Sequence, residues 1–231
     1  MKLGIMQPYF LPYIGYFQLI NAVDEFVIYD NVKYTKKGWI NRNMFLQDGK
    51  GVEFTIPLKK ASDSLDVNER EVSSSFNQKK LLNRICTSYQ KAPYFDEALA
   101  VLTRVVNCTE NNLFRFVYYS VKEVCKFLNI TTKIMISSNV DIDHSLRGED
   151  RVLAICKAND ASMYINAIGG QKLYSYDQFL NNGVELKLIK SDDIEYKQFN
   201  HDFVPWLSML DVVMFNGKDK LAEMLERYRL L

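Results

Sequence analysis

The sequence opens with MKLGIMQPYFLPYIGYFQLINAVDEFVIYD (residues 1–30), and this stretch alone predicts the class of the fold. Leu3 to Met6 is a short apolar run that ends at Gln7-Pro8, which is typical of a buried strand. Pro12 suits a first helical turn, apolar side chains then recur at helical spacing from Ile14 to Ile20, and Phe26 to Tyr29 predicts a second buried strand. Strand, helix and strand in this order form a βαβ unit, whose two strands are parallel.

The same alternation returns in the second half of the chain. Strands are expected at 133–137, 163–166 and 185–189, and helices at 149–158, 176–182, 208–215 and 218–228. The helix at 208–215 is predicted from Ser208, with Asp211 three residues further on.

The middle of the chain interrupts this pattern. An Asp-Gly turn at 48–49 predicts a β-hairpin, a short strand is expected around Val67, and helical periodicity runs from 76 to 128. We therefore predict an α/β fold with a mostly parallel, Rossmann-like sheet and a helical insertion (about residues 75–130) covering it. Residues 1–231 are expected to form a single domain.

Charge and composition argue against several classes of protein. Twenty-nine basic residues balance 28 acidic ones. The chain therefore has no overall positive electrostatic potential that would attract nucleic acid or an anionic bilayer. No stretch is long and apolar enough for a membrane span, and the first residues lack the core of a signal peptide. The four cysteines show neither CxxC nor zinc spacing. We expect a cytoplasmic protein with reduced thiols, no nucleic-acid partner and no membrane insertion.

The first candidate site is QPYFLPYIGY (7–16), between the first strand and its helix. Ligands of open α/β sheets bind at this position, because free N–H groups and the helix dipole converge there. Its candidate substrate-binding residues are Gln7, Tyr9, Tyr13 and Gly15. The layout resembles nucleotidylyltransferase-type folds in part, but no histidine occurs in the first 143 residues. An aromatic turn that only packs is the alternative.

The second candidate site follows the next strand. It holds Asp30, Tyr34, Trp39, Asn41, Arg42 and Asn43. Asp30 is expected on the same rim as Gln7, where a carboxylate can serve as a general base. The arginine offers a fork for phosphate or carboxylate, the two asparagines suit hydroxyl or amide groups, and the aromatic rings suit a sugar or base. A solvated loop with an exposed ion pair is the alternative.

A third candidate site is YINAIGGQ (164–171), in which Asn166 precedes Gly169 and Gly170 at a strand end. Two glycines permit positive φ angles and exposed backbone amides, although plain turns also contain such pairs. His144 follows Asp143, which could tune it as a base; an exposed or structural histidine is the alternative. No spacing of His, Asp or Cys predicts a metal site.

With these motifs in view, the chain resembles the WbqC-like protein family from end to end. The resemblance rests on QPYFLPYIGYFQLI (7–20), VIYDNVKY (27–34), NRN (41–43), YQKAPYF (89–95), YINAIGGQKLY (164–174), YKQF (196–199), LSMLDVVMFNG (207–217) and LAEMLERYRLL (221–231). Each motif alone is weak, whereas their order across the whole chain is specific. Phe76 stands where many relatives are expected to carry tryptophan.

The resemblance implies a transferase of O-antigen or other surface-polysaccharide biosynthesis. It implies transfer of a glycyl or other acyl group to the amino group of a nucleotide-linked amino sugar. Asp30 or His144 would then be the base, Arg42 and the helix start at Gly15 would hold phosphate, and the amides of Gly169 and Gly170 would stabilise an oxyanion. These roles require the stretches near positions 10, 40 and 168 to line one cleft.

Several questions about partners stay open at the level of sequence. The acyl donor could be an acyl carrier protein, coenzyme A or an ATP-activated amino acid, and no tightly bound cofactor is expected. A homodimer is a further candidate assembly. Two other functions compete with acyl transfer: a nucleotidyl-transfer or ATP-dependent activating enzyme, and a non-catalytic subunit that binds a sugar nucleotide.

Overall fold

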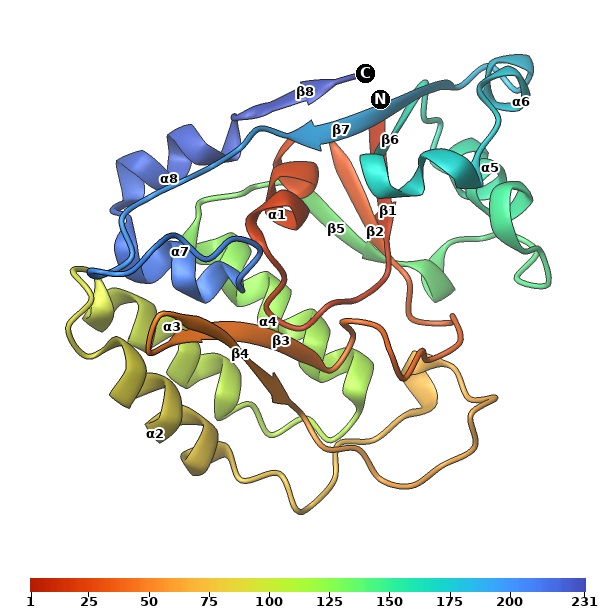
Figure 1. Cartoon of the computed structure of the whole chain (residues 1–231). Helices are drawn as coiled ribbons and strands as arrows, with labels where there is room; N and C mark the ends of the chain where they lie inside the picture. Colours follow the sequence, from red (N-terminus) through yellow and green to blue (C-terminus); the bar gives the residue numbers. More distant parts are fainter.

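The computed structural model describes all 231 residues, and a six-stranded sheet lies at its centre (Figure 1). The strand order is β5-β2-β1-β6-β7-β8. The strands are β1 (Lys2–Met6), β2 (Glu25–Ile28), β5 (Lys133–Ile136), β6 (Met163–Ala167), β7 (Glu185–Ser191) and β8 (Tyr228–Leu230). The first five are mutually parallel, and only β8 is antiparallel to its neighbour. The predicted α/β fold with a mostly parallel sheet is confirmed.

Helices cover both faces of this sheet, because successive side chains of a strand point to opposite faces. Leu3, Ile5 and Val27 pack in a cluster with α5 (Gly148–Ala158) and α6 (Tyr176–Asn181). Phe26 and Ile28 point to the other face and join a cluster of 42 buried residues. That cluster includes the apolar side of α1 (Ile14–Asn21), of the helical insertion, and of α7 (Met209–Phe215) and α8 (Lys218–Leu225).

The helical insertion consists of α2 (Gln78–Tyr89), α3 (Phe95–Val106) and α4 (Leu113–Phe127), as the periodicity predicted. Asparagine side chains start two of these helices. Asn77 accepts a hydrogen bond from the backbone N–H of Lys80 at 2.8 Å, and Asn112 accepts one from Arg115 at 3.1 Å. No helix of the chain has both the length and the apolar character that crossing a bilayer requires.

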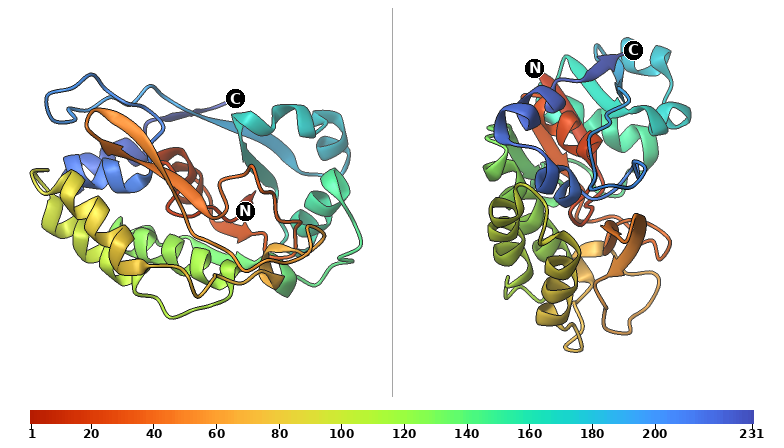
Figure 2. Two further views of the ribbon diagram at one scale, coloured as in Figure 1. Left: turned by 60° about the horizontal axis from the view of Figure 1, so that its bottom comes forward. Right: turned by 60° about the vertical axis from the view of Figure 1, so that its left-hand side comes forward.

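A hairpin of β3 (Arg42–Gln47) and β4 (Lys50–Thr55) forms a separate two-stranded sheet. Figure 2 shows it beside the helical layer and outside the main sheet. Its turn has positive φ at both Asp48 (51°) and Gly49 (71°). This is the Asp-Gly turn that the sequence predicted, because left-handed residues match the twist of the two strands.

Three local predictions were wrong. The segment around Val67 is a 3₁₀ turn (Val67–Glu69), closed by a capping box between Asp66 and Glu69, and not a strand. The first helix begins at Ile14, after the two prolines. The last helix ends at Leu225, and Tyr228–Leu230 forms the edge strand β8, whose backbone pairs with β7 and so ends the sheet.

Candidate functional site

The site lies where the strand order reverses, at the carboxyl ends of β1 and β6. From β1 the chain continues to β2 and β5 on one side of the sheet, and to β6 and β7 on the other. Such a reversal leaves a crevice beyond the strand ends. The register pairs Gly4 with Ile165 and Met6 with Ile28. The residues that follow these strands, including Gln7 and Asp30, therefore emerge at one edge of the sheet, as predicted.

Two tyrosines hold Gln7 at this edge. The hydroxyl of Tyr16 donates to the backbone carbonyl of Gln7 at 2.9 Å, and the hydroxyl of Tyr9 donates to its side-chain Oε1 at 3.3 Å. Burial raises the pKa of Tyr16 well above its ordinary value, so this hydroxyl remains a donor. The amide nitrogen of the Gln7 side chain makes no hydrogen bond within the protein and can donate to a ligand.

Gly15 packs closely against an aromatic ring at the start of α1. A Cβ at this position would overlap the ring of Tyr13, which folds back over the first turn of α1. The glycine therefore permits the close approach of the Tyr13 ring to the first turn of α1. Burial raises the pKa of Tyr13, which keeps its hydroxyl neutral.

The stretches near positions 10 and 40 are bound directly to each other. The backbone N–H of Phe10 donates to the carbonyl of Trp39 at 3.3 Å. The side-chain amide of Asn43 donates to the carbonyls of Phe10 (3.0 Å) and Leu11 (2.8 Å), and its oxygen accepts from the N–H of Met44. Leu11 has a positive φ of 44°, which these bonds help to hold. Asn43 thus shapes the site, with its polar atoms already engaged.

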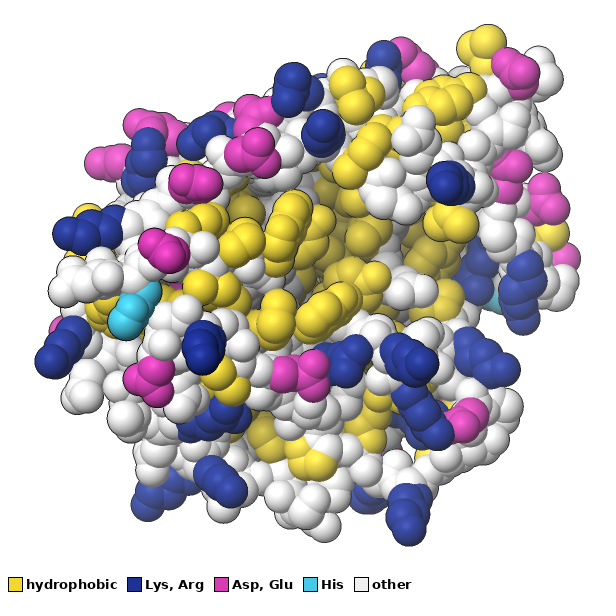
Figure 3. Space-filling model, viewed as in Figure 1, with side chains coloured by type: hydrophobic (Ala, Val, Ile, Leu, Met, Phe, Trp, Pro, Cys, Tyr) yellow, Lys and Arg dark blue, Asp and Glu magenta, His cyan; other side chains and the backbone are white.

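These two stretches enclose a hollow of about 330 Å³, which we call the aromatic hollow. It is lined by Tyr9, Pro12, Tyr13, Trp39, Asn43, Met44 and Trp206. Figure 3 shows apolar side chains gathered in the depression at the centre of this face. Trp206 is 68% exposed and meets the ring of Tyr13 edge-on at 5.7 Å. Its φ of +62° is rare for a bulky residue, and such strain clusters at ligand sites.

Arg42 and Asn41 are engaged within the protein. Arg42 donates from Nε to the carbonyl of Gly38 at 3.0 Å and from Nη2 to that of Lys37 at 2.6 Å. Its Nη1 lies 3.4 Å from Glu53, so little of the predicted phosphate fork is free. Asn41 donates to the carbonyl of Ile56 at 2.8 Å and accepts from the hydroxyl of Tyr34 at 2.9 Å. Both residues stabilise the loop and the start of the hairpin.

Asp30 is buried, and both of its carboxylate oxygens accept hydrogen bonds. Its Oδ1 accepts from the hydroxyl of Ser137 (2.8 Å) and the backbone N–H of Ser138 (2.9 Å), and its Oδ2 accepts from the amide of Asn68 (3.0 Å). Burial alone would raise the pKa of Asp30, but the hydrogen bonds from Ser138, Ser137 and Asn68 outweigh it and lower the pKa. A carboxylate held in this way is a weak base, and the geometry favours a role in joining β2 to β5.

His144 lies in a second polar cluster beside Asp30. Its Nδ1 is 3.2 Å from the side-chain nitrogen of Asn31, whose oxygen accepts from Ser137 and from buried Arg151. Because that oxygen is engaged, the amide nitrogen of Asn31 faces Nδ1 of the imidazole and can donate to it. The contact with Asn31 engages the Nδ1 edge of the ring within the protein.

The third stretch reaches the same edge of the sheet but does not line the aromatic hollow. Asn166 is buried and accepts from the N–H of Ala167 at 2.8 Å. A Cβ on Gly170 would lie 2.5 Å from the Nδ2 of Asn166, so this glycine allows the Asn166 side chain to approach the backbone closely. Gly169 has open space around it, and neither glycine has the positive φ that the sequence suggested. The expected single cleft thus unites two of the three stretches.

A second hollow of about 330 Å³ adjoins the first, since Tyr13 and Trp206 line both. It is lined by three acidic residues: Asp192 pairs with Arg229, whereas Asp193 and Glu195 form no ion pair. Sequence reasoning missed these residues and Trp206, because they lie far along the chain and carry no motif; the one available signal was a tryptophan in a loop. No group of three or more His, Cys, Asp or Glu side chains is arranged to hold a metal ion.

The chain has relatives among known proteins. A model of the WbqC-like protein family matches residues 7–223. The chain is also similar to the uncharacterized protein Rv1507c of Mycobacterium tuberculosis, with 26% identity over 222 residues, which cover 94% of this chain and 95% of that protein. No solved structure matches the chain.

Proposed function

The chain belongs to the WbqC-like protein family, and from this premise we propose that it is a transferase of surface-polysaccharide biosynthesis. In the proposed reaction a glycyl or other acyl group moves to the amino group of a nucleotide-linked amino sugar. The amine nitrogen attacks the acyl carbonyl carbon, the bond between that carbon and the donor's oxygen or sulfur breaks, and the amine loses a proton to a base.

The aromatic hollow is the observation that carries this proposal. Four aromatic rings surround a volume of about 330 Å³, namely those of Tyr9, Tyr13, Trp39 and Trp206. The hollow lies at the edge of the sheet where α/β proteins bind their ligands. Aromatic side chains present the flat apolar surface on which a sugar or a nucleotide base stacks. The free amide of Gln7, beside Tyr9, adds a donor for a hydroxyl or carbonyl oxygen.

The neighbouring carboxylates support an amino sugar as the acceptor. Asp193 and Glu195 line the adjoining hollow without ion-pair partners, and this hollow shares Tyr13 and Trp206 with the aromatic hollow. A sugar stacked between the rings would bring its ammonium group toward negative charge. A carboxylate there could also take up the proton that the amine must lose.

The test is transfer itself, followed by mass spectrometry. Purified protein is incubated with an amino-sugar nucleotide and, in separate reactions, with an acyl carrier protein thioester, acyl-CoA, or glycine with ATP. We expect the sugar nucleotide to gain the mass of one acyl group with one of these donors. The absence of any mass gain with all three donors would contradict the proposed reaction.

Ligand binding to the aromatic hollow can be followed separately. The protein has two tryptophans, Trp39 and Trp206, and both line the aromatic hollow. All of its tryptophan fluorescence therefore comes from residues of this hollow. We expect an amino-sugar nucleotide to quench this fluorescence in a saturable way. Trp39→Phe and Trp206→Phe should each retain part of the signal, and Trp206→Ala should weaken binding about tenfold because one stacking surface is lost. A signal that does not change with ligand would count against the hollow as the binding site.

A second function is favoured by the state of the two predicted bases. The carboxylate of Asp30 is tied to three donors, and the Nδ1 of His144 is occupied by Asn31. Both groups have hydrogen-bond partners within the protein, which supports a subunit that binds a sugar nucleotide for a partner enzyme. Saturable quenching without turnover under all donor conditions would support this second function.

A further inference from the structure

A pocket of about 630 Å³ lies apart from the aromatic hollow, between the start of the hairpin and the 59–70 segment. We call it the basic pocket, since it is lined by Lys36, Lys59, Lys60 and Arg70 and by one carboxylate, Asp63. In Figure 3 basic side chains gather at the lower right, where Figure 1 shows these loops. No function proposed above uses this charge.

Arg70 lies at the floor of the basic pocket with unused hydrogen-bond donors. It is 4% exposed, and its guanidinium group stacks on the ring of Tyr34 at 4.6 Å. Both Nε and Nη2 are shielded from water and make no hydrogen bond. A buried charged group is normally fully hydrogen-bonded, because water no longer solvates it. The pocket therefore provides a charge whose donors have no partner.

The two unpaired nitrogens form one edge of the guanidinium plane. Nε–H and Nη2–H point the same way, and this pair matches two oxygens of a phosphate or carboxylate. The stacking on Tyr34 holds the plane, and the hydroxyl of Tyr34 is itself fixed by Asn41 at 2.9 Å. The edge is thus oriented before any ligand arrives.

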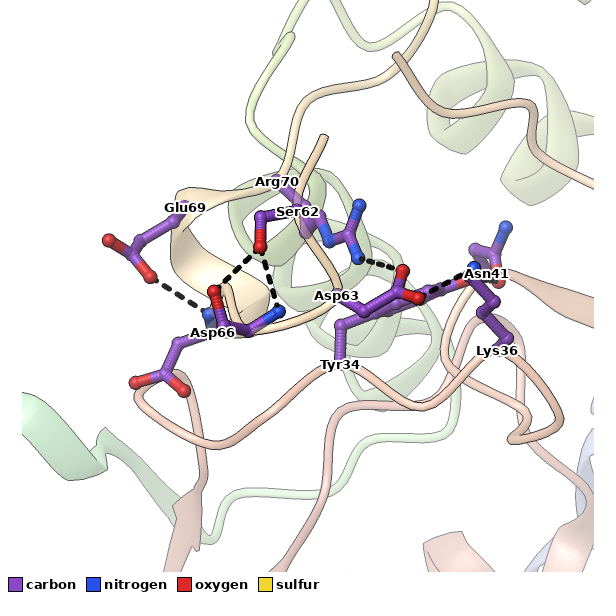
Figure 4. Close-up of polar contacts among 9 residues, drawn as sticks. Tyr34, Lys36, Asn41, Ser62, Asp63, Asp66, Glu69 and Arg70 are labelled. Atoms are coloured by element: carbon purple, nitrogen blue, oxygen red, sulfur yellow. Dashed lines mark hydrogen bonds and ion pairs between the residues drawn. The ribbon is translucent and has the colours of Figure 1, made fainter. Parts of the chain in front are cut away.

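Asp63 shows which kind of ligand suits this position (Figure 4). One of its carboxylate oxygens is 3.8 Å from Nη2 of Arg70, and the other is 2.9 Å from Nζ of Lys36. The hydrogen bond from Lys36 lowers the pKa of Asp63, so it is anionic at neutral pH. An anion already bridges the two cations, yet it stands too far from Arg70 for a hydrogen bond. The side chain of Asp63 is 69% exposed, so a ligand can reach this position from solvent.

We propose that the basic pocket binds a phosphoryl group of a small-molecule ligand, which replaces the carboxylate of Asp63 between Arg70 and Lys36. Two phosphoryl oxygens accept from Nε and Nη2 of Arg70, and a third accepts from Lys36. Lys60, which has no ion-pair partner, adds long-range attraction at the mouth, while Lys59 is shared with Glu71. Carboxylates are less suited, because they lack a third oxygen for the lysine.

Calorimetric titration of the full chain with inorganic pyrophosphate at low salt tests this site. We expect saturable binding that Arg70→Gln weakens about tenfold or more, since two charge-assisted bonds are lost. Lys60→Gln should weaken it about threefold. Asp63→Asn should tighten it, because the competing carboxylate is gone. Arg115→Gln removes the same charge from an exposed helix position, Arg115 having no side-chain partner, and should leave the affinity unchanged.

Tighter binding by Asp63→Asn is the decisive outcome, because a misfolded variant would bind more weakly. Absence of pyrophosphate binding to both the wild type and Asp63→Asn would overturn the proposal. So would a folded Arg70→Gln variant with wild-type affinity. If Arg70→Gln does not fold, unchanged affinities of Asp63→Asn and Lys60→Gln overturn it instead. Competition with coenzyme A and with a nucleoside-diphosphate sugar then distinguishes the two sources of the phosphoryl group. These results are independent of acyl transfer, since the readout is binding alone.

Discussion

Replacement of Asp211 by alanine is expected to lower the free energy of unfolding by about 3–5 kcal/mol. Asp211 is completely buried in α7. Its Oδ1 accepts from the hydroxyl of Tyr89 at 2.7 Å, and its Oδ2 accepts from the hydroxyl of Tyr196 and the amide of Gln198, both at 2.6 Å. Burial raises the pKa of Asp211 although these three bonds lower it, so the carboxylate depends on its partners. Alanine would leave three buried donors without an acceptor.

The loss of stability in Asp211→Ala should exceed that of the hydrogen bonds alone, because the carboxylate of Asp211 connects several elements. Tyr89 also accepts from the backbone N–H of Leu46 at 2.7 Å, which connects α2, α7 and the hairpin. Denaturation by guanidinium chloride measures the loss. Tyr196→Phe is the matched control: it removes one donor, leaves the other two paired, and should cost about 1 kcal/mol. Stability of Asp211→Ala within 1 kcal/mol of the wild type would show that the network contributes little.

Most strands and helices of the main sheet layer could be predicted in their order along the chain, because each has its own pattern of apolar residues within a short stretch of sequence. The apolar run before Gln7, the helical spacing from Ile14 and the run before Asp30 are visible within 30 residues. The rule that parallel strands end at one edge then places Gln7 beside Asp30. β8 was missed because three residues without an apolar run carry no periodicity, and its pairing with β7 depends on where α8 ends.

The chemical roles within the site could not be predicted, because they depend on partners far along the chain. Asn43 suits ligand recognition by type, yet its amide is bound to the carbonyls of Phe10 and Leu11. Arg42 looks like a phosphate fork in the sequence, whereas the arginine with a free edge is Arg70. Composition shows which polar groups exist, and only the fold shows which of them already have a hydrogen-bond partner.

Asp211 illustrates the same difference in the packing. The sequence predicted a helix start from Ser208 and Asp211, and α7 does begin there, with the hydroxyl of Ser208 accepting from the N–H of Leu210 at 3.3 Å. The carboxylate, however, accepts hydrogen bonds from the hydroxyls of Tyr89 and Tyr196. A capping pattern predicts only the local backbone. It does not predict contacts with Tyr89 and Tyr196, which lie 122 and 15 residues from Asp211 along the chain.

Asp30→Asn is expected to lower the free energy of unfolding by about 2–3 kcal/mol at pH 7, because an amide nitrogen would face a donor in place of a carboxylate oxygen. The pKa of Asp30 in the folded protein lies below the ordinary 3.8 of the unfolded chain. The stability that this difference supplies is therefore complete above the unfolded pKa and is lost as the pH falls through the folded one. The difference in the free energy of unfolding between wild type and Asp30→Asn should therefore become smaller below about pH 4.

Urea denaturation from pH 7 to pH 3 measures this gap, with Asp193→Asn as the control. Asp193 is exposed and forms no ion pair, so its replacement should change stability by less than about 0.5 kcal/mol at every pH. A gap for Asp30→Asn that stays constant down to pH 3 would contradict the hydrogen-bonded carboxylate. The same variant separates the two roles of Asp30. A base would lose turnover with little loss of stability, whereas a residue that joins β2 to β5 would lose stability first, and any activity would fall with the folded fraction.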